Sequence, residues 1–244
     1  MSSRTVNTRE VIGEVLLTLG VLLLLFAFYE AYWTNLDAGR KQSQAQEQLH
    51  DAWTNPRTNH TPSLGDAFAV LRIPAFGADY QYAVVEGTDD AALLTGPGHY
   101  SDTQMPGAPG TFALAGHRVG KGAPFNDLGR LKVCDEIVVE TREATVTYRV
   151  LPMEGGAGRR GDMEGCLSGP ALDRVAGGDY AGVLGRHITV PSDVSVIAPR
   201  PGQQGEKVSP DLLPMLTLTT CHPQFSNAER MIIHAVQTDI TPKR

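Results

Sequence analysis

A cysteine and an arginine stand nine residues apart near the C-terminal end of the chain. Cys221 ends a strong strand-forming run at 216–220, and the turn-like stretch 222–227 leads into a second strand that begins near Arg230. If the two strands pair antiparallel, Cys221 and Arg230 become cross-strand neighbours about 5 Å apart. The guanidinium can then stabilise a thiolate, or the oxyanion that forms when sulfur attacks a carbonyl group.

His117 is the candidate general base for this thiol. It follows the short apolar strand predicted at 111–115 and Gly116, and it enters a glycine-rich loop. A thiol and an imidazole at strand ends are a suitable pair for nucleophilic catalysis. From spacing alone, the ordinary alternatives stay open, namely a buried structural cysteine and a histidine of the surface or the core.

A β-rich body must position these residues, because short apolar runs bounded by Gly, Pro and Asp recur from residue 68 onward. The 26 glycines and 16 prolines show no Gly-X-Y period, which excludes collagen and favours many turns. A short helix is predicted at 89–95 with Thr88 as its N-cap. The strand spacing predicts a barrel or a sandwich, with strands at 69–73, 82–85, 111–115, 136–140, 145–150, 188–190, 194–197, 215–220 and 231–237.

An apolar stretch near the N-terminus is long enough to span a membrane. Residues 15–28 carry no charge, and tolerating Glu14 and Glu30 extends the stretch to 11–33. Arg4 and Arg9 on its N-terminal side favour a cytoplasmic N-terminus. We therefore predict a single-pass cell-membrane protein. A cleaved signal peptide and a buried helix of a soluble protein remain alternatives.

This orientation divides the chain into four parts. Residues 1–10 form a cytoplasmic tail, 11–33 the transmembrane anchor, 34–66 an extracytoplasmic stalk and linker, and 67–244 the catalytic domain. Disulfides persist outside the cytoplasm, and three cysteines leave at least one thiol out of any intramolecular disulfide.

Charge and motif content exclude two classes of site. The net charge of −6 and a pI near 5.6 remove the electrostatic basis for binding nucleic acid. The sequence has no C-x-x-C or H-x-x-x-H motif and only scattered carboxylates, so neither a metal site nor a cofactor is expected.

The motifs around Cys221 and His117 resemble those of sortases, the cysteine transpeptidases of Gram-positive cell surfaces. The agreement comes from Leu-Thr-Thr-Cys at 218–221 with Arg230 nine residues later, and from Ala-Gly-His at 115–117. Segments 107–111, 124–128 and 189–194 also resemble the corresponding segments of sortases. The run through His222-Pro223 and the segment 96–100 look most like class E sortases, which favour a Leu-Ala-x-Thr-Gly sorting signal over Leu-Pro-x-Thr-Gly.

This resemblance covers roughly residues 68–150 and 187–240. It implies an all-β fold, a closed barrel of roughly eight strands with one or two short helices, preceded by one transmembrane helix. It also implies that Cys221 cleaves the signal between Thr and Gly through a thioester, while Arg230 holds the oxyanion and His117 protonates the departing amine.

The implied partners are surface proteins with a sorting signal, an amine of a peptidoglycan precursor or a pilin as acceptor, and the membrane. The alternative is a catalytically silent, membrane-anchored barrel that binds wall or sorting peptides. Five residues are candidates for substrate binding. The family resemblance implies that Tyr100 shapes the pocket for the second signal residue. Thr219 lies two residues before Cys221, so the two side chains point to the same face of the strand. The other candidates are Thr220, His222 and Val194.

Two features depart from the family pattern. About 35 residues, 151–186, stand where the family has a short connection, and their lack of period predicts a long inserted loop. Cys134 stands where a glycine is expected, and Cys166 lies in the insertion. If Cys221 stays free, as the resemblance implies, a disulfide between Cys134 and Cys166 would pin the insertion to the barrel end. Two unrelated buried thiols are the alternative.

Overall fold

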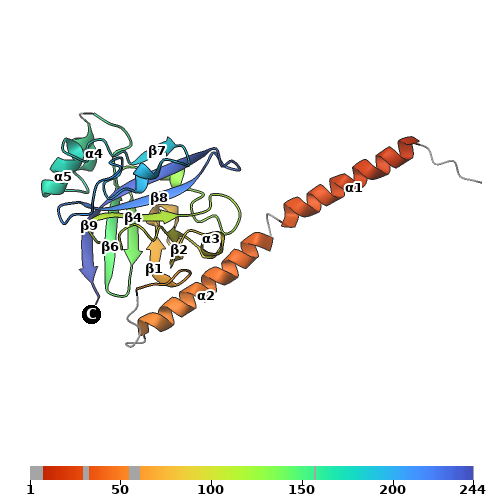
Figure 1. The fold of residues 1–244 in the computed structure, drawn as a ribbon, viewed down its shortest axis with the longest axis horizontal. Helices are drawn as coiled ribbons and strands as arrows, with labels where there is room; N and C mark the ends of the chain where they lie inside the picture. Colours follow the sequence, from red (N-terminus) through yellow and green to blue (C-terminus); the bar gives the residue numbers. More distant parts are fainter. Residues whose placement is uncertain (1–7, 30–32, 55–60, 157, 244) are drawn as a thin grey trace, which may run out of the picture.

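The computed structural model describes residues 8–29, 33–54, 61–156 and 158–243. Two helices, α1 (Thr8–Phe28) and α2 (Thr34–Thr54), precede a body of β-strands (Figure 1). Within the described part of the chain, α1 is the one helix long and apolar enough to cross a membrane, and none of its residues is buried. Residues 1–7 of the predicted tail, 30–32 of the anchor and 55–60 of the linker lie outside the described residues.

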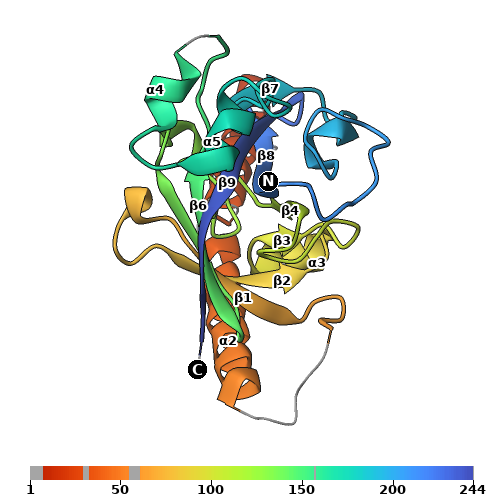
Figure 2. The same ribbon diagram turned by 90° about the vertical axis from the view of Figure 1, so that its left-hand side faces the viewer.

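Nine strands in the described residues form one sheet that closes on itself (Figure 2). The order β6-β5-β1-β2-β3-β4-β8-β9, with β9 pairing back to β6, makes a closed ring of eight strands, and β7 adds to β9 outside it. The predicted fold class is therefore confirmed. The strands are β1 (Ala67–Arg72), β2 (Gln81–Glu86), β3 (Gly98–His99), β4 (Gly110–Ala115), β5 (Glu136–Glu140), β6 (Ala144–Val150), β7 (Arg186–Thr189), β8 (Pro214–His222) and β9 (Glu229–Pro242).

Side chains at alternate strand positions fill the barrel, as the period of a pleated strand requires. On β6, for example, Val146, Tyr148 and Val150 are fully buried. The main core also holds apolar side chains of six further strands, among them Leu71, Val84, Phe112, Leu114, Ile137, Leu216, Leu218 and Ile233.

Short helical segments differ from the sequence predictions in two places. The helix at 89–95 is α3 (Asp90–Thr95), and its N-cap is Asp89 instead of Thr88, because the Asp89 carboxylate accepts the Ala92 N–H at 2.8 Å. The strand predicted at 194–197 is wrong. This segment is the 3-10 helix η4 (Val194–Ile197), which begins where the Asp193 carboxylate accepts the Ser195 N–H. The other 3-10 helices described are η2 (Pro74–Phe76) and η3 (Leu128–Arg130).

α2 packs along the barrel, although its residues were predicted to form part of a stalk. Its buried side chains are Ala38, Gln42, Ala45 and Leu49, which share one helix face. This face contacts β1, β2 and α3. The Gln42 side chain donates to the carbonyls of Ala83, at 3.3 Å, and Thr95, at 2.7 Å, and it accepts the Ala83 N–H. β3 is too short to reach Ala83, so Gln42 completes the hydrogen bonding of this stretch of β2.

We expect Gln42→Ala to lower the free energy of unfolding by about 1–3 kcal/mol, because the buried Ala83 N–H would lose its acceptor. The measurement is urea unfolding of the detergent-solubilised full chain, followed by near-UV circular dichroism. Gln44→Ala is the matched control, since Gln44 is exposed on the same helix. Equal midpoints for the two variants would show that Gln42 does not secure α2.

The insertion is folded, so the prediction of an irregular loop was wrong. It contains α4 (Arg159–Met163) and α5 (Gly169–Ala176), helices of 5 and 8 residues that are too short to show a period in the sequence. Arg159 is 2% exposed and donates to the carbonyls of Glu154, at 3.1 Å, Val175, at 3.1 Å, and Val183, at 2.9 Å. A second core packs this unit on the barrel through Leu151, Met163, Leu172, Val175, Tyr180, Met215 and Val236.

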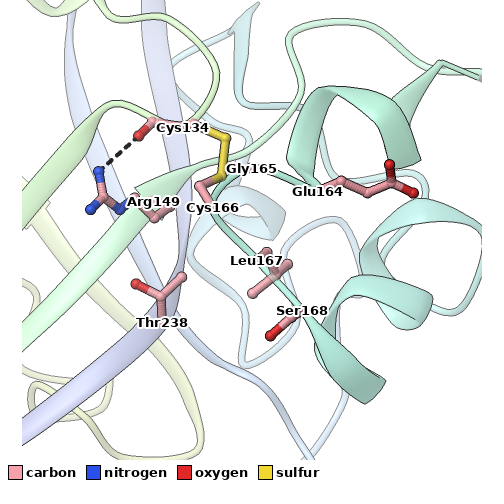
Figure 3. A pocket seen from close by; sticks show the side chains of 8 residues that line it. All are labelled: Cys134, Arg149, Glu164, Gly165, Cys166, Leu167, Ser168 and Thr238. Atoms are coloured by element: carbon pink, nitrogen blue, oxygen red, sulfur yellow. Dashed lines mark hydrogen bonds between the residues drawn. A yellow bond between two sulfur atoms is a disulfide. The ribbon is translucent and has the colours of Figure 1, made fainter.

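A disulfide joins Cys134, which precedes β5, to Cys166, between α4 and α5 (Figure 3). The two residues are separated by 32 positions in the sequence, and their Cα atoms are 5.8 Å apart. Beside the disulfide lies an open hollow of about 490 Å³, where Arg149 donates to the Cys134 carbonyl at 3.2 Å. The bond therefore fixes the insertion to the end of the barrel where β5 starts.

Thiol titration of the denatured, unreduced chain should find one reactive thiol, that of Cys221. The double variant Cys134→Ser with Cys166→Ser should unfold with a free energy lower by about 3 to 4 kcal/mol, because it frees a loop of this length in the unfolded chain. Three thiols in the unreduced chain would contradict the disulfide.

Candidate active site

Cys221 and Arg230 face each other across the β8–β9 hairpin. The antiparallel register pairs Cys221 with Arg230 and His222 with Glu229, which confirms the predicted cross-strand pair. Cys221 is outside the disulfide and is partly exposed. The Arg230 Nη1 donates to the carbonyls of Asn227, at 3.4 Å, and Glu229, at 3.1 Å. Among the described residues no carboxylate forms an ion pair with this guanidinium, so its charge remains available to an anion.

The parallel pairing of β4 and β8 brings His117 to the same barrel end as Cys221. Ala115 lies opposite Thr219, and His117 and Cys221 each follow two residues later. Two bonds hold this end together: the Gly116 N–H donates to the Thr219 carbonyl at 3.1 Å, and the Thr220 hydroxyl donates to the Gly116 carbonyl at 2.8 Å. Neighbouring strands lie about 5 Å apart, so the imidazole and the thiol leave adjacent strand ends.

The position of His117 depends on a glycine. A Cβ at Gly116 would come within 2.5 Å of the Phe125 ring, and Phe125 in turn donates its N–H to the His117 carbonyl at 3.0 Å. Burial lowers the pKa of His117, and the positive charge of Lys121 lowers this pKa further. The His117 Nε2 atom is buried without a hydrogen-bond partner among the described residues. A neutral imidazole in this position can accept the proton of a thiol.

Arg118 is a site residue that the sequence reasoning missed. Its Nη1 donates to the Cys221 carbonyl at 3.3 Å and to the His222 Nδ1 at 2.6 Å. It therefore ties the loop after His117 to the end of β8. The one sequence feature that could have indicated Arg118 is its position next to His117. His222, a candidate for substrate binding, uses its ring nitrogen for this bond and lies 4.0 Å from the Glu229 carboxylate through Nε2.

The other candidate substrate residues fall into different places. The Tyr100 hydroxyl lies 3.0 Å from the Thr219 hydroxyl, so the structure brings these two together two residues from the nucleophile. Thr220 is 3% exposed, and its hydroxyl fixes the end of β4 instead of facing a groove. Val194 is 55% exposed at the start of η4.

A buried pair behind Tyr100 was also missed. The His99 Nδ1 and a Glu86 carboxylate oxygen lie 2.7 Å apart, and both side chains are almost fully buried. The other His99 nitrogen contacts the Gln104 carbonyl at 3.2 Å and the Thr103 hydroxyl at 3.1 Å. This network holds the loop that carries Tyr100 against the barrel.

Comparison with known proteins identifies the family. The family model described as "Sortase domain" matches residues 71–238, which includes all of the residues above. The chain therefore belongs to the sortase family. The family predicted from the sequence is therefore confirmed.

Relatives of this sortase include proteins from Streptomyces coelicolor and Corynebacterium diphtheriae. Sortase SrtE1 of Streptomyces coelicolor is 34% identical over 95% of this chain and 58% of its own length. The chain thus spans about three-fifths of the length of this curated relative. Among solved structures, a SrtF sortase from Corynebacterium diphtheriae is 55% identical, covers 78% of this chain and 93% of its own, and has a TM-score of 0.75.

A solved structure of sortase E1 from Streptomyces coelicolor, which holds a tripeptide in its active site, is 29% identical. It covers 75% of this sortase and 94% of its own chain, with a TM-score of 0.52. Relatives thus include sortases of class E, the class that the motifs resemble, and a SrtF sortase of higher identity.

For this sortase we expect kcat/KM to fall on the acid side with a midpoint below about pH 6.5, the ordinary pKa of imidazole, because protonated His117 cannot accept the thiol proton. Lys121→Gln removes a cation that lowers the pKa of His117, so this variant should move the midpoint to higher pH. The pH profile of peptide cleavage measures both effects. Lys132→Gln is the control, and an identical shift in it would refute a specific effect of Lys121.

Proposed function

We propose that this sortase is anchored in the cell membrane by α1 and cleaves a C-terminal sorting signal between Thr and Gly. It then transfers the truncated protein to an amine. The observation that carries this proposal is the register of β8 with its two neighbours, which places Cys221 opposite Arg230 and beside the end of the strand that leads to His117.

The first half of the reaction forms a thioester. The Cys221 thiol gives its proton to the neutral His117 ring while its sulfur bonds to the Thr carbonyl carbon. The negative charge on the carbonyl oxygen faces Arg230 and a backbone N–H. When this intermediate collapses, the bond from carbon to the glycine nitrogen breaks, and His117 returns the proton to the departing amine.

The second half transfers the acyl group. An incoming amine loses a proton to His117 and attacks the thioester, and an amide forms as the Cys221 sulfur leaves and regains a proton. The amine belongs to a peptidoglycan cross-bridge or to a pilin lysine. Water can compete with it slowly, which releases the truncated protein by hydrolysis.

Recognition of the signal is assigned to side chains close to the nucleophile. The Tyr100 hydroxyl contacts the Thr219 hydroxyl two residues before Cys221, and Tyr100 is the candidate for shaping the pocket of the second signal residue. The Leu-Ala-x-Thr-Gly signal is the proposed substrate in preference to Leu-Pro-x-Thr-Gly, because the motifs of this sortase resemble those of class E. The proposal includes a cytoplasmic N-terminus for α1, so that Cys221 lies outside the cytoplasm, where surface proteins and their acceptors are found. It is supported by the length and apolar character of α1.

The test is the intact mass of the full chain in detergent after incubation with a Leu-Ala-x-Thr-Gly peptide, and in parallel with a Leu-Pro-x-Thr-Gly peptide. The expected mass gain equals the peptide truncated after Thr, because a thioester retains that part. Cys221→Ala should bind the peptide and gain no mass.

The matched comparison is Cys166→Ala, which should still gain the adduct because Cys166 lies in the disulfide outside the site. No adduct with either peptide, in a chain whose Cys221 is shown to be reduced, would favour a barrel that only binds peptides.

A further inference from the structure

The turn between β8 and β9 presents a large aromatic side chain to the outside. Phe225 is 88% exposed, and its φ of 62° lies in the left-handed region that bulky residues rarely adopt. The turn is held in place, because the Gln224 side chain donates to the Asn126 side chain at 2.6 Å. An aromatic ring kept exposed on a fixed, strained turn indicates a partner outside the barrel.

The barrel has a fixed orientation relative to α2, which follows the end of α1. Gln42 secures the middle of α2. Near its start, the Asn35 side chain accepts the Gly122 N–H at 3.0 Å, and the Gly122 carbonyl accepts the Tyr82 hydroxyl at 3.0 Å. The loop after His117 is thus held between α2 and β2, on the side of the barrel where α1 begins to extend away (Figure 1).

Phe225 and the last turn of α1 border one hollow of about 590 Å³. Its walls include Ala27 of α1, Asn35 of α2, Arg118 beside the catalytic histidine, and Gln224 and Phe225 of the hairpin turn. Figure 1 shows the dark-blue turn of this hairpin pointing toward the junction of the two helices. The end of the apolar helix and the exposed ring therefore lie beside the same hollow.

We propose that Phe225 inserts into the headgroup layer of the membrane that α1 crosses, so that the rim of the active site rests on the lipid surface. This inference rests on the proposed anchoring by α1. The partner is a phospholipid interface, where aromatic rings are favoured. Tyr29 and Trp33, which are 52% and 58% exposed, follow the same end of α1, and Phe225 shares a hollow with Ala27 of the last turn of α1.

The consequence concerns how a substrate arrives. Cys221 lies four residues before Phe225 on the same hairpin, so insertion of the ring holds the nucleophile close to the lipid surface. A sorting signal that is still attached to the membrane can then contact Cys221 without extending far from the lipid surface. The sortase would then favour a membrane-attached signal over the same peptide in solution.

The first experiment uses tryptophan fluorescence of the full chain in phosphatidylcholine and phosphatidylglycerol vesicles with acyl chains brominated near the headgroup. Trp33→Phe and Trp53→Phe remove the 2 native tryptophans. In that background, Phe225→Trp is compared with Val208→Trp, since Val208 is 53% exposed and does not border the hollow. We expect strong quenching of the first variant and little of the second. Equal quenching of the two variants overturns the proposal. So does an absence of quenching of Phe225→Trp in protein that floats with the vesicles.

The second experiment measures kcat/KM for a lipid-linked and a soluble sorting peptide in the same vesicles. Phe225→Ser should lower the ratio of the two on the order of five- to tenfold, a change of about 1 to 1.4 kcal/mol, and Val208→Ser should leave the ratio unchanged. An unchanged ratio for Phe225→Ser overturns the proposal. If the unmodified chain cleaves neither peptide, this result would instead contradict the proposed function. If the chain does not float with the vesicles in a density gradient, α1 is not a membrane anchor, and the inference loses its basis.

Discussion

The pairing of β8 on both of its edges is the constraint on which the site depends. On one edge β8 runs parallel to β4, and on the other it is antiparallel to β9. Parallel pairing brings the ends of two strands that are distant in sequence to one barrel end, whereas antiparallel pairing sets two residues of one hairpin opposite each other. A thiol at the end of β8 therefore has an imidazole on one side and a guanidinium on the other. Arg230 lies within β9, and His117 lies two residues beyond the end of β4.

Buried polar side chains attach the remaining elements to this barrel. Gln42 forms hydrogen bonds with the part of β2 that the short β3 does not reach. Arg159 donates hydrogen bonds to several backbone carbonyls of the insertion. The His99 and Glu86 pair secures the loop of Tyr100. In each case backbone groups that lack a strand partner would otherwise be buried unsatisfied, which is costly. The same bonds that satisfy these groups also fix the position of α2, the insertion and the substrate loop relative to the nucleophile.

The strands and the central chemistry were predictable because their signals are local. The run before Cys221 alternates and is bounded by turn residues, and the distance to Arg230 suits a hairpin. The segment at 194–197 has the residue types of a strand, but one carboxylate, that of Asp193, turns it into a helix. Arg118 and Gln42 were missed for a different reason. A polar residue in a loop or on a helix face gives no sign in one sequence that a distant backbone group needs it.

The insertion leaves Arg230 in place because its two ends meet at one point of β9. The Leu151 N–H donates to the His234 carbonyl, and the His234 N–H donates to the carbonyl of Gly185, both at 3.0 Å. The Gly185 N–H closes the ring at the Pro152 carbonyl, 2.7 Å away, and a Cβ at Gly185 would come within 1.9 Å of the Leu151 carbonyl oxygen. Only glycine allows this approach. Chain can therefore be added between these ends without moving β7, which pairs with Arg230 through Thr189. The length of the insertion is then free to change, while the distance from guanidinium to thiol is not.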